Sequence, residues 1–204
     1  MEKRIKEAIR YLGYKKCAVD NQMMQLILNT SQELEQLAEP RFIYRIFELS
    51  FPDSNTVQIG HLKIESQSLC TNLSGCEKSI LFAATLGIEI DRQMRKYERI
   101  DMTKAVVWQA LAASYIEEYL DAKQEELSRL YVEEANILRP RFSPGYGDFS
   151  ILHQKDVLDM LDATKQIGIA LTDGYMLTPT KSVTAVIGIC RAKEKGTEIC
   201  YQKD

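Results

Sequence analysis

The sequence predicts an α+β fold in which helices flank a central mixed or antiparallel sheet. Segments with strand patterns fall into two clusters, and helical segments stand between them without a regular alternation of strand and helix. A chain of 204 residues, of which 45% are apolar, can also bury a core without metal or disulfide staples. We therefore expect a single domain over residues 1–204, which begins with a helical segment over residues 1–40.

The N-terminal segment is predicted to hold two helices. The first runs from Glu2 to Leu12, and Gly13 suits the residue that follows its last turn. The second begins after Asp20, whose side chain can cap it, and ends at Pro40. Its apolar positions are Met23, Met24, Ile27, Leu34 and Leu37. We expect these helices either to fold over the rest of the domain or to serve as a docking face.

A β-hairpin and a buried strand are predicted next. Residues 41–50 and 56–64 alternate, or nearly alternate, between apolar and polar side chains, and turn-forming residues 52–55 separate them. The continuous apolar run at residues 79–86 has the length of a strand and ends at Gly87. A strand that is apolar on both faces belongs at the centre of a sheet.

The second half of the chain repeats the sequence of helices followed by strands. Residues 88–100 have a helical pattern, and Asp101 can cap a longer helix whose far end is strongly charged. Residues 150–161 are also predicted to be helical, with a serine cap. Residues 167–172 and 182–189 are predicted to form the final pair of strands.

Charge and composition argue against several partners and sites. The net charge of −3 provides no basic patch for nucleic acid or an anionic membrane, and no apolar run is long enough to cross a bilayer. With a charged amphipathic N-terminus, this predicts a cytoplasmic protein with no membrane or nucleic-acid partner.

The odd number of cysteines and the lack of a C-x-x-C pair predict free structural thiols rather than a disulfide framework or a metal site. These cysteines are Cys17, Cys70, Cys76, Cys190 and Cys200. His61 and His153 belong to no metal-ligand motif, and each is expected to be a surface or hydrogen-bonded residue.

Common nucleotide and hydrolase motifs are missing from the sequence. It has no G-x-G-x-x-G turn after a strand, no phosphate-binding P-loop and no G-x-S-x-G elbow. A Rossmann methyltransferase, a P-loop nucleotidase and an α/β-hydrolase are therefore poorly supported.

The segment Leu138-RPRFSPGYGDFS-Ile151 contains the best candidate for a binding site. It joins a fixed cation, Arg141, to a Pro-Gly bend and an aromatic hydroxyl, Tyr146. Pro144 restricts the backbone of its neighbours, while Gly145 can adopt a positive φ or let a ligand approach closely. Arg141 can offer two parallel hydrogen bonds to a carboxylate. The alternative is an ordered turn whose arginine lies in solvent.

The segment from Arg141 to Val183 resembles the S-adenosylmethionine-binding activation domain of cobalamin-dependent methionine synthase, which is marked by an Arg-x-x-Pro-Gly-Tyr turn. After this turn the family has a helix, a Gly-Ile-x-Leu-Thr-Glu segment, a proline and a Ser-Val-Ser/Thr strand. The matching positions are 154–161, 168–173, Pro179 and 182–184. Upstream, residues 85–87 and 112–118 look like the short free-standing members of that family. The resemblance implies the activation-domain fold.

The resemblance also implies roles for individual residues. Arg141 would pair with the methionine carboxylate, Ser143 would offer backbone hydrogen bonds, and Tyr146 would flank the adenosyl group or hydrogen-bond within the turn. Glu117, with Glu118 as the alternative, would meet the ammonium or sulfonium charge. The implied cofactor-binding residues are Arg141, Ser143, Pro144, Gly145, Tyr146 and Glu117, with no catalytic residue and no metal ligand. Residues 147–152 and the single Tyr201 depart from the family, which has a Pro-Ala-Cys-Pro segment and a Tyr-Tyr pair there.

The function implied by the resemblance is repair of an oxidised corrinoid. The D-x-H-x-x-G motif that supplies a cobalt ligand in many corrinoid proteins is missing, so a partner would carry the cobalamin. One hypothesis is an accessory reactivation protein that uses S-adenosylmethionine and acts on a methionine synthase or related corrinoid methyltransferase. A flavodoxin-type reductant would supply the electron. A second is a non-catalytic module that senses S-adenosylmethionine or docks on a corrinoid protein. A third is an unrelated α+β protein that binds a small molecule.

Overall fold

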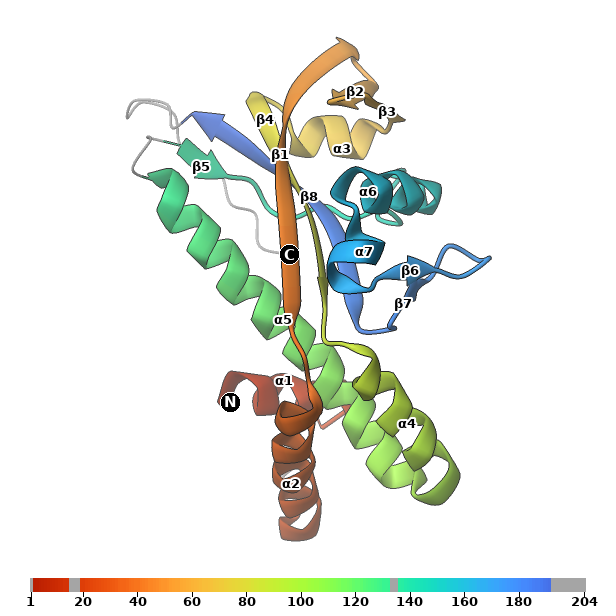
Figure 1. Cartoon of the computed structure of the whole chain (residues 1–204). Helices are drawn as coiled ribbons and strands as arrows, with labels where there is room; N and C mark the ends of the chain where they lie inside the picture. The colour runs from red at the N-terminus through yellow and green to blue at the C-terminus, as the bar shows by residue number, and fades with distance from the viewer. Residues whose placement is uncertain (1, 15–18, 133–135, 192–204) are drawn as a thin grey trace.

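The computed structural model describes residues 2–14, 19–132 and 136–191, and it confirms the predicted α+β class (Figure 1). Its centre is a six-stranded antiparallel sheet in the order β3-β2-β1-β4-β8-β5, accompanied by a small hairpin of β6 and β7. The strands are β1 (Arg41–Asp53), β2 (Thr56–Ile59), β3 (Leu62–Glu65), β4 (Cys76–Thr85), β5 (Asn136–Leu138), β6 (Ala170–Leu171), β7 (Leu177–Thr178) and β8 (Ser182–Arg191). The helices are α1 (Glu2–Tyr11), α2 (Asn21–Leu37), α3 (Gln67–Asn72), α4 (Ile88–Ile100), α5 (Met102–Val132), the 3-10 turn η1 (Ile151–His153), α6 (Gln154–Leu161) and α7 (Ala163–Ile167).

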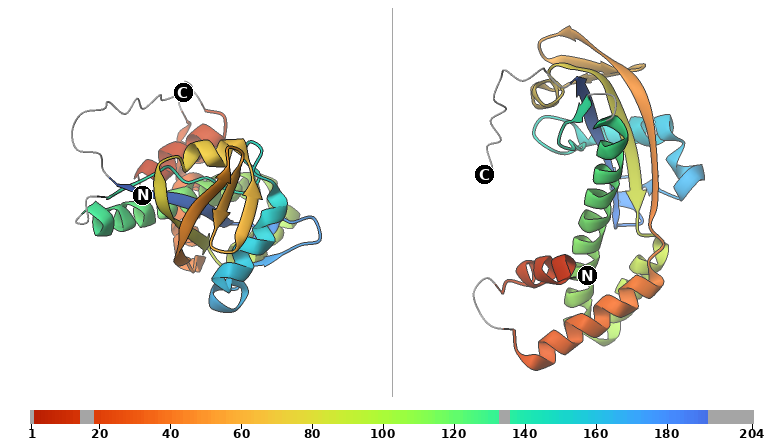
Figure 2. Two further views of the ribbon diagram at one scale, coloured as in Figure 1. Left: turned by 90° about the horizontal axis from the view of Figure 1, so that it is seen from above. Right: turned by 90° about the vertical axis from the view of Figure 1, so that its left-hand side faces the viewer.

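The sheet separates two hydrophobic cores, and its central strands contribute to both. Successive side chains of a strand point to opposite faces of the sheet, so neighbouring residues of β4 enter different cores. Phe82 lies in one core and Leu81 in the other. Helix α5 runs along one face, whereas α6 and α7 cover the other (Figure 2). The prediction of a central strand at residues 79–86 is therefore confirmed, with β1 and β8 as its neighbours.

The N-terminal helices pack on the first half of α5, beside α4 (Figure 1). The predicted caps are confirmed: Asp20 accepts a hydrogen bond from the Met23 backbone at 2.8 Å, and Gly13 has a φ of +88° just beyond α1. The Arg4 side chain is 7% exposed and pairs with Glu35 and Glu118 at 2.6 Å. Of the two expected arrangements, the structure has the one in which these helices fold over the rest of the chain.

Two predictions about strand pairing are wrong in part. The predicted hairpin exists, but its second arm at residues 56–64 breaks at Gly60, where φ is +58°, and β3 turns back to pair with β2. The final strands do not pair with each other, since β6 pairs with β7 while β8 lies between β4 and β5. The turn at residues 172–175 allows β6 to fold back locally, and β8 is apolar on both faces and so takes a central position.

The expectation that all cysteines are free is also wrong. Cys76 and Cys190 are partners in the register of β4 and β8, and they form a disulfide. The number and spacing of cysteines could not reveal this, because the pairing depends on two strands that are far apart in sequence. Cys70 is free and buried, and burial raises the pKa of its thiol. Cys17 and Cys200 lie outside the described residues.

Within the described ranges, no helix has the length and apolar character needed to cross a membrane.

Candidate functional site

The turn with the Arg-x-x-Pro-Gly-Tyr pattern leaves the edge of the sheet beside β8. The Arg139 backbone donates a hydrogen bond to the Gly188 carbonyl, and Phe142 and Val186 exchange two backbone hydrogen bonds of 2.9 and 2.8 Å. This extended pairing makes neighbouring side chains point in opposite directions. Phe142 joins the core beneath α6 and α7, whereas Arg141 reaches α5 on the other face.

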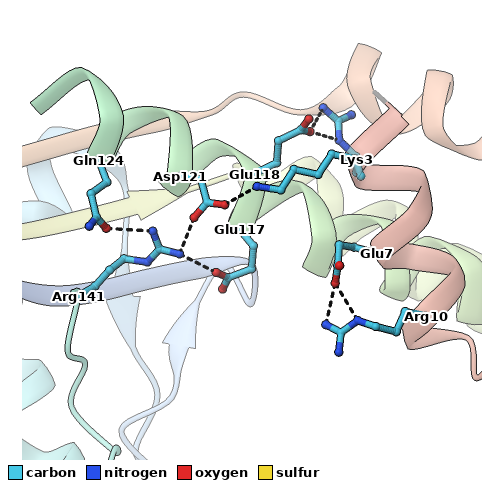
Figure 3. Close-up of polar contacts among 9 residues, drawn as sticks. Lys3, Glu7, Arg10, Glu117, Glu118, Asp121, Gln124 and Arg141 are labelled. Atoms are coloured by element: carbon cyan, nitrogen blue, oxygen red, sulfur yellow. Dashed lines mark hydrogen bonds and ion pairs between the residues drawn. The ribbon is translucent and has the colours of Figure 1, made fainter. Parts of the chain in front are cut away.

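Arg141 contacts three polar side chains on one face of α5 (Figure 3). Its guanidinium donates to Glu117 at 3.0 Å, to Asp121 at 2.9 Å and to Gln124 at 3.1 Å. These acceptors lie at helical positions i, i+4 and i+7, so they share one face. The Arg141 side chain is only 23% exposed, so the alternative of an arginine lying in solvent is wrong.

A second cation, Lys3 of α1, joins the same cluster (Figure 3). Its ammonium lies 2.8 Å from the carboxylate of Asp121, which therefore contacts both Lys3 and Arg141. Burial raises the pKa of Asp121, but the hydrogen bonds from Lys3 and Arg141 outweigh this effect and leave the pKa below its ordinary value. Glu118 instead faces Arg4, so the glutamate that the structure places beside Arg141 is Glu117.

Two hollows flank Arg141. One has a volume of about 520 Å³ and lies between the end of α5 and the segment of Pro140 and Arg141. The other, of about 340 Å³, lies between α1 and α5 and is bordered by Lys3, Glu117, Asp121 and Arg141. Both volumes fall within the range of about 300–1,000 Å³ that is usual for ligand pockets. Carboxylates beside a guanidinium complement a ligand that carries both an anionic and a cationic group.

The Pro-Gly-Tyr part of the turn borders a separate hollow of about 280 Å³. Pro144 is buried, Gly145 has a φ of +96°, and the Tyr146 side chain is 64% exposed. The other residues around this hollow are Ser143, Gln154, Met176, Leu177, Thr180, Ser182, Val183 and Thr184. The structure thus groups Arg141 with Glu117, and Ser143 and Pro144 with Tyr146, and among the hollows formed by the described residues these two groups border different ones.

Several polar residues near these groups were not predicted. Asp121 and Gln124 could have been found from their spacing to Glu117 on one helix face, whereas nothing in the sequence places Lys3 beside Asp121. Gln154 donates to the Tyr175 carbonyl at 2.9 Å and accepts from Thr184 at 3.2 Å, so it fixes one wall of the Tyr146 hollow. In the described part of the chain, no group of three or more His, Cys, Asp or Glu side chains could hold a metal ion. Tyr201 lies outside this part.

Comparisons with known proteins agree with this architecture. Residues 70–195 match the family described as "Vitamin B12 dependent methionine synthase, activation domain". Among solved structures, the chain is similar to the MetH reactivation domain bound to AdoHcy, with a TM-score of 0.68 and 14% sequence identity. That match covers 96% of this chain and 77% of the other, and it supports the fold. No curated protein sequence matches this chain.

Proposed function

Because this chain belongs to the family of activation domains of vitamin B12-dependent methionine synthases, we propose that it is an accessory reactivation protein. In this proposal it binds S-adenosylmethionine and supports the reductive methylation of cob(II)alamin on a partner protein. The partner is a cobalamin-dependent methionine synthase or a related corrinoid methyltransferase. The similar MetH reactivation domain binds AdoHcy, which is the product left when S-adenosylmethionine loses its methyl group.

The observation that carries the proposal is the arrangement of charges around Arg141. The methionine part of S-adenosylmethionine has a carboxylate, an ammonium and a sulfonium. Arg141 is suited to the carboxylate, and Glu117 beside it is suited to the ammonium or sulfonium. In the structure these two side chains pair with each other, so ligand binding would exchange one set of ionic partners for another.

The main contribution of this chain to the reaction is to position a methyl group. The partner's cobalamin, after it had gained one electron from a flavodoxin-type reductant, would supply the nucleophile that accepts the sulfonium methyl. Arg141 and Glu117 would hold the methionine part of S-adenosylmethionine, and S-adenosylhomocysteine would be the leaving group. No proton is transferred, so no general acid or base is needed, and holding the methyl in line with cobalt is the contribution left to the protein.

Two measurements test the proposal. Calorimetry with S-adenosylmethionine and S-adenosylhomocysteine is expected to show saturable binding to this chain. Methylcobalamin is expected to form when this chain, S-adenosylmethionine, a reductant and a cob(II)alamin-loaded partner are mixed, and to be nearly absent when any one is omitted. Binding without any effect on methylation would favour the sensing or docking alternative. No binding at millimolar ligand would contradict both.

A further inference from the structure

The carboxylate of Asp148 fastens the Pro-Gly-Tyr turn to the start of α3, although the two segments are about eighty positions apart. Its oxygens accept hydrogen bonds from the Ser66 hydroxyl at 2.6 Å, the Gln67 backbone at 2.7 Å and the Ser68 backbone at 3.1 Å. The two backbone donors belong to the first turn of α3, where no helical carbonyl can accept them. The hydrogen bond from Ser66, together with those from Ser68 and Gln67, lowers the pKa of Asp148 to about 2 despite some desolvation.

Gly147 permits this close approach. Its φ is +54°, and a Cβ atom there would lie 2.8 Å from the Ser68 hydroxyl oxygen and 3.1 Å from the Ser68 Cβ. Any other residue would therefore be strained in its own backbone and would push the turn away from α3. Gly147 and Asp148 fall in the short segment where the sequence departs from the large enzymes of the family.

Phe149 is a second anchor of the turn, directly after Asp148, so the chain is fixed within three residues of Tyr146. Phe149 is 1% exposed and stacks on Phe142 with ring centroids 6.3 Å apart. Within the turn, the Gly145 backbone donates to the Phe149 carbonyl at 2.7 Å, and Phe149 donates back to the Tyr146 carbonyl at 3.0 Å. Tyr146 itself is the exposed member of this segment, and its backbone position is set by its neighbours rather than by burial of its own ring.

We infer that Asp148 is a positioning residue that holds Tyr146 in place for the ligand by docking the turn on α3. This inference rests on the proposed function and on the role that the family resemblance implies for Tyr146, which would flank the adenosyl group of S-adenosylmethionine. Asp148 does not touch the ligand. Its contribution is to order the turn before binding, so that the ligand does not bear the entropic cost of fixing it.

The first test compares Asp148→Asn with Asp159→Asn. The control removes another exposed carboxylate, whose side chain pairs with Lys155 one helical turn away. Amide hydrogen exchange of the ligand-free proteins is expected to be about tenfold faster at residues 66–69 and 145–149 in Asp148→Asn only. Gly147→Ala is expected to give the same pattern. Gly13→Ala is its control, because Gly13 also has a positive φ but has open space around it, and this variant is expected to leave exchange at these residues unchanged. Equal exchange at these residues in Asp148→Asn and Asp159→Asn would overturn the inference.

The second test is a double-mutant cycle on ligand affinity, with S-adenosylhomocysteine as the probe. Asp148→Asn is expected to weaken binding roughly threefold to tenfold in the parent chain, which corresponds to the ordering of one or two side chains. In a Tyr146→Ala background the same change is expected to have no further effect, because the residue that it positions is gone. An equal loss in both backgrounds would assign Asp148 a general structural role and overturn the inference. If the parent binds no ligand, the proposed function fails, while the exchange measurement still decides whether Asp148 holds the turn.

Discussion

At the scale of single residues, Arg141 has a setting that serves either a bound ligand or a structural ion pair. It contacts two carboxylates and an amide on α5, and all three lie on one helix face. For the proposed ligand a lysine would not be equivalent, since an ammonium cannot offer a carboxylate the two parallel hydrogen bonds of a guanidinium. The two roles are separated by measuring binding and stability on the same variant.

We expect Arg141→Ala to weaken binding of S-adenosylhomocysteine by about 1.5–3 kcal/mol, or roughly ten- to a hundredfold, through loss of a charge-assisted hydrogen bond. Calorimetry measures the affinity, and chemical denaturation measures the stability. Arg129→Ala is the matched control, because Arg129 is exposed and pairs with Glu125 on the same helix. Unchanged affinity in a folded Arg141→Ala protein would remove this arginine from the site.

Asp148 gives a pH-dependent contribution to stability. Its pKa of about 2 in the folded chain lies below the ordinary 3.8, so the folded state binds its proton less readily than the unfolded state. The stabilisation is therefore complete above the ordinary pKa and is lost as the pH falls towards 2. We expect the parent to be more stable than Asp148→Asn at pH 7, and this difference to shrink at pH 3. Urea denaturation of both proteins at the two pH values measures this, and a difference that stays constant would contradict it.

The sequence predicted part of the candidate site at this scale. The family resemblance assigned Glu117 and Arg141 to the same ligand, and in the structure their side chains lie 3.0 Å apart. Asp121 and Gln124 follow from helical spacing once Glu117 is placed. Lys3 and Ser66 could not be predicted, because each meets its partner only after distant segments have packed together.

At the scale of helices and strands, patterns that depend on neighbouring residues predicted best. The caps at Asp20 and Asp101 and the apolar run of β4 are local signals, and all three are confirmed. The break at Gly60 and the pairing of β8 depend on how several strands share one sheet, so they were missed. Helix α3 and strand β5 were also missed, since six and three residues are too few to show a period.

A buried cation, Arg4, contributes to the docking of α1. Arg4 pairs with Glu35 of α2 and Glu118 of α5, and its guanidinium lies 3.7 Å from the centre of the Tyr115 ring. We expect Arg4→Ala to lower the free energy of unfolding by about 1–3 kcal/mol, less than for a fully buried pair because both glutamates are partly exposed. Lys6→Ala is the control, since Lys6 is exposed and pairs with Glu2 on the surface of the same helix. Chemical denaturation measures the change, and equal stability of the two variants would show that other contacts hold α1.

At the scale of the whole molecule, the two parts of the candidate site emerge on different faces of the sheet. Arg141 reaches α5, which covers one face, while the Tyr146 hollow is bordered by residues of α6, β7 and β8. A ligand that contacts both Arg141 and Tyr146 must therefore extend along the edge of the sheet where the turn leaves β8. This geometry leaves the exposed side of the turn available to a partner.

The last prediction concerns that partner. Tyr146, Leu152 and Met176 are large apolar side chains that are 64%, 54% and 62% exposed, and Tyr146 and Met176 border the same hollow. A corrinoid protein that brings cobalt to a methyl group at this turn would cover them. We expect Leu152→Glu to leave binding of S-adenosylhomocysteine unchanged, because Leu152 borders neither the Tyr146 hollow nor the charged contacts at Arg141. Met176 borders that hollow, so Met176→Glu is assayed at saturating S-adenosylmethionine.

The same variants are expected to raise the partner concentration needed for half-maximal methylcobalamin formation by about tenfold or more, since each places a charge in an apolar contact. The maximal rate at saturating partner should be nearly unchanged. Ile100→Glu is the matched control, because Ile100 is 67% exposed but lies at the end of α4, away from the turn. If the control and the two variants depend on partner concentration in the same way, the partner docks elsewhere, and the methyl group must reach cobalt by a route that does not involve this side of the turn.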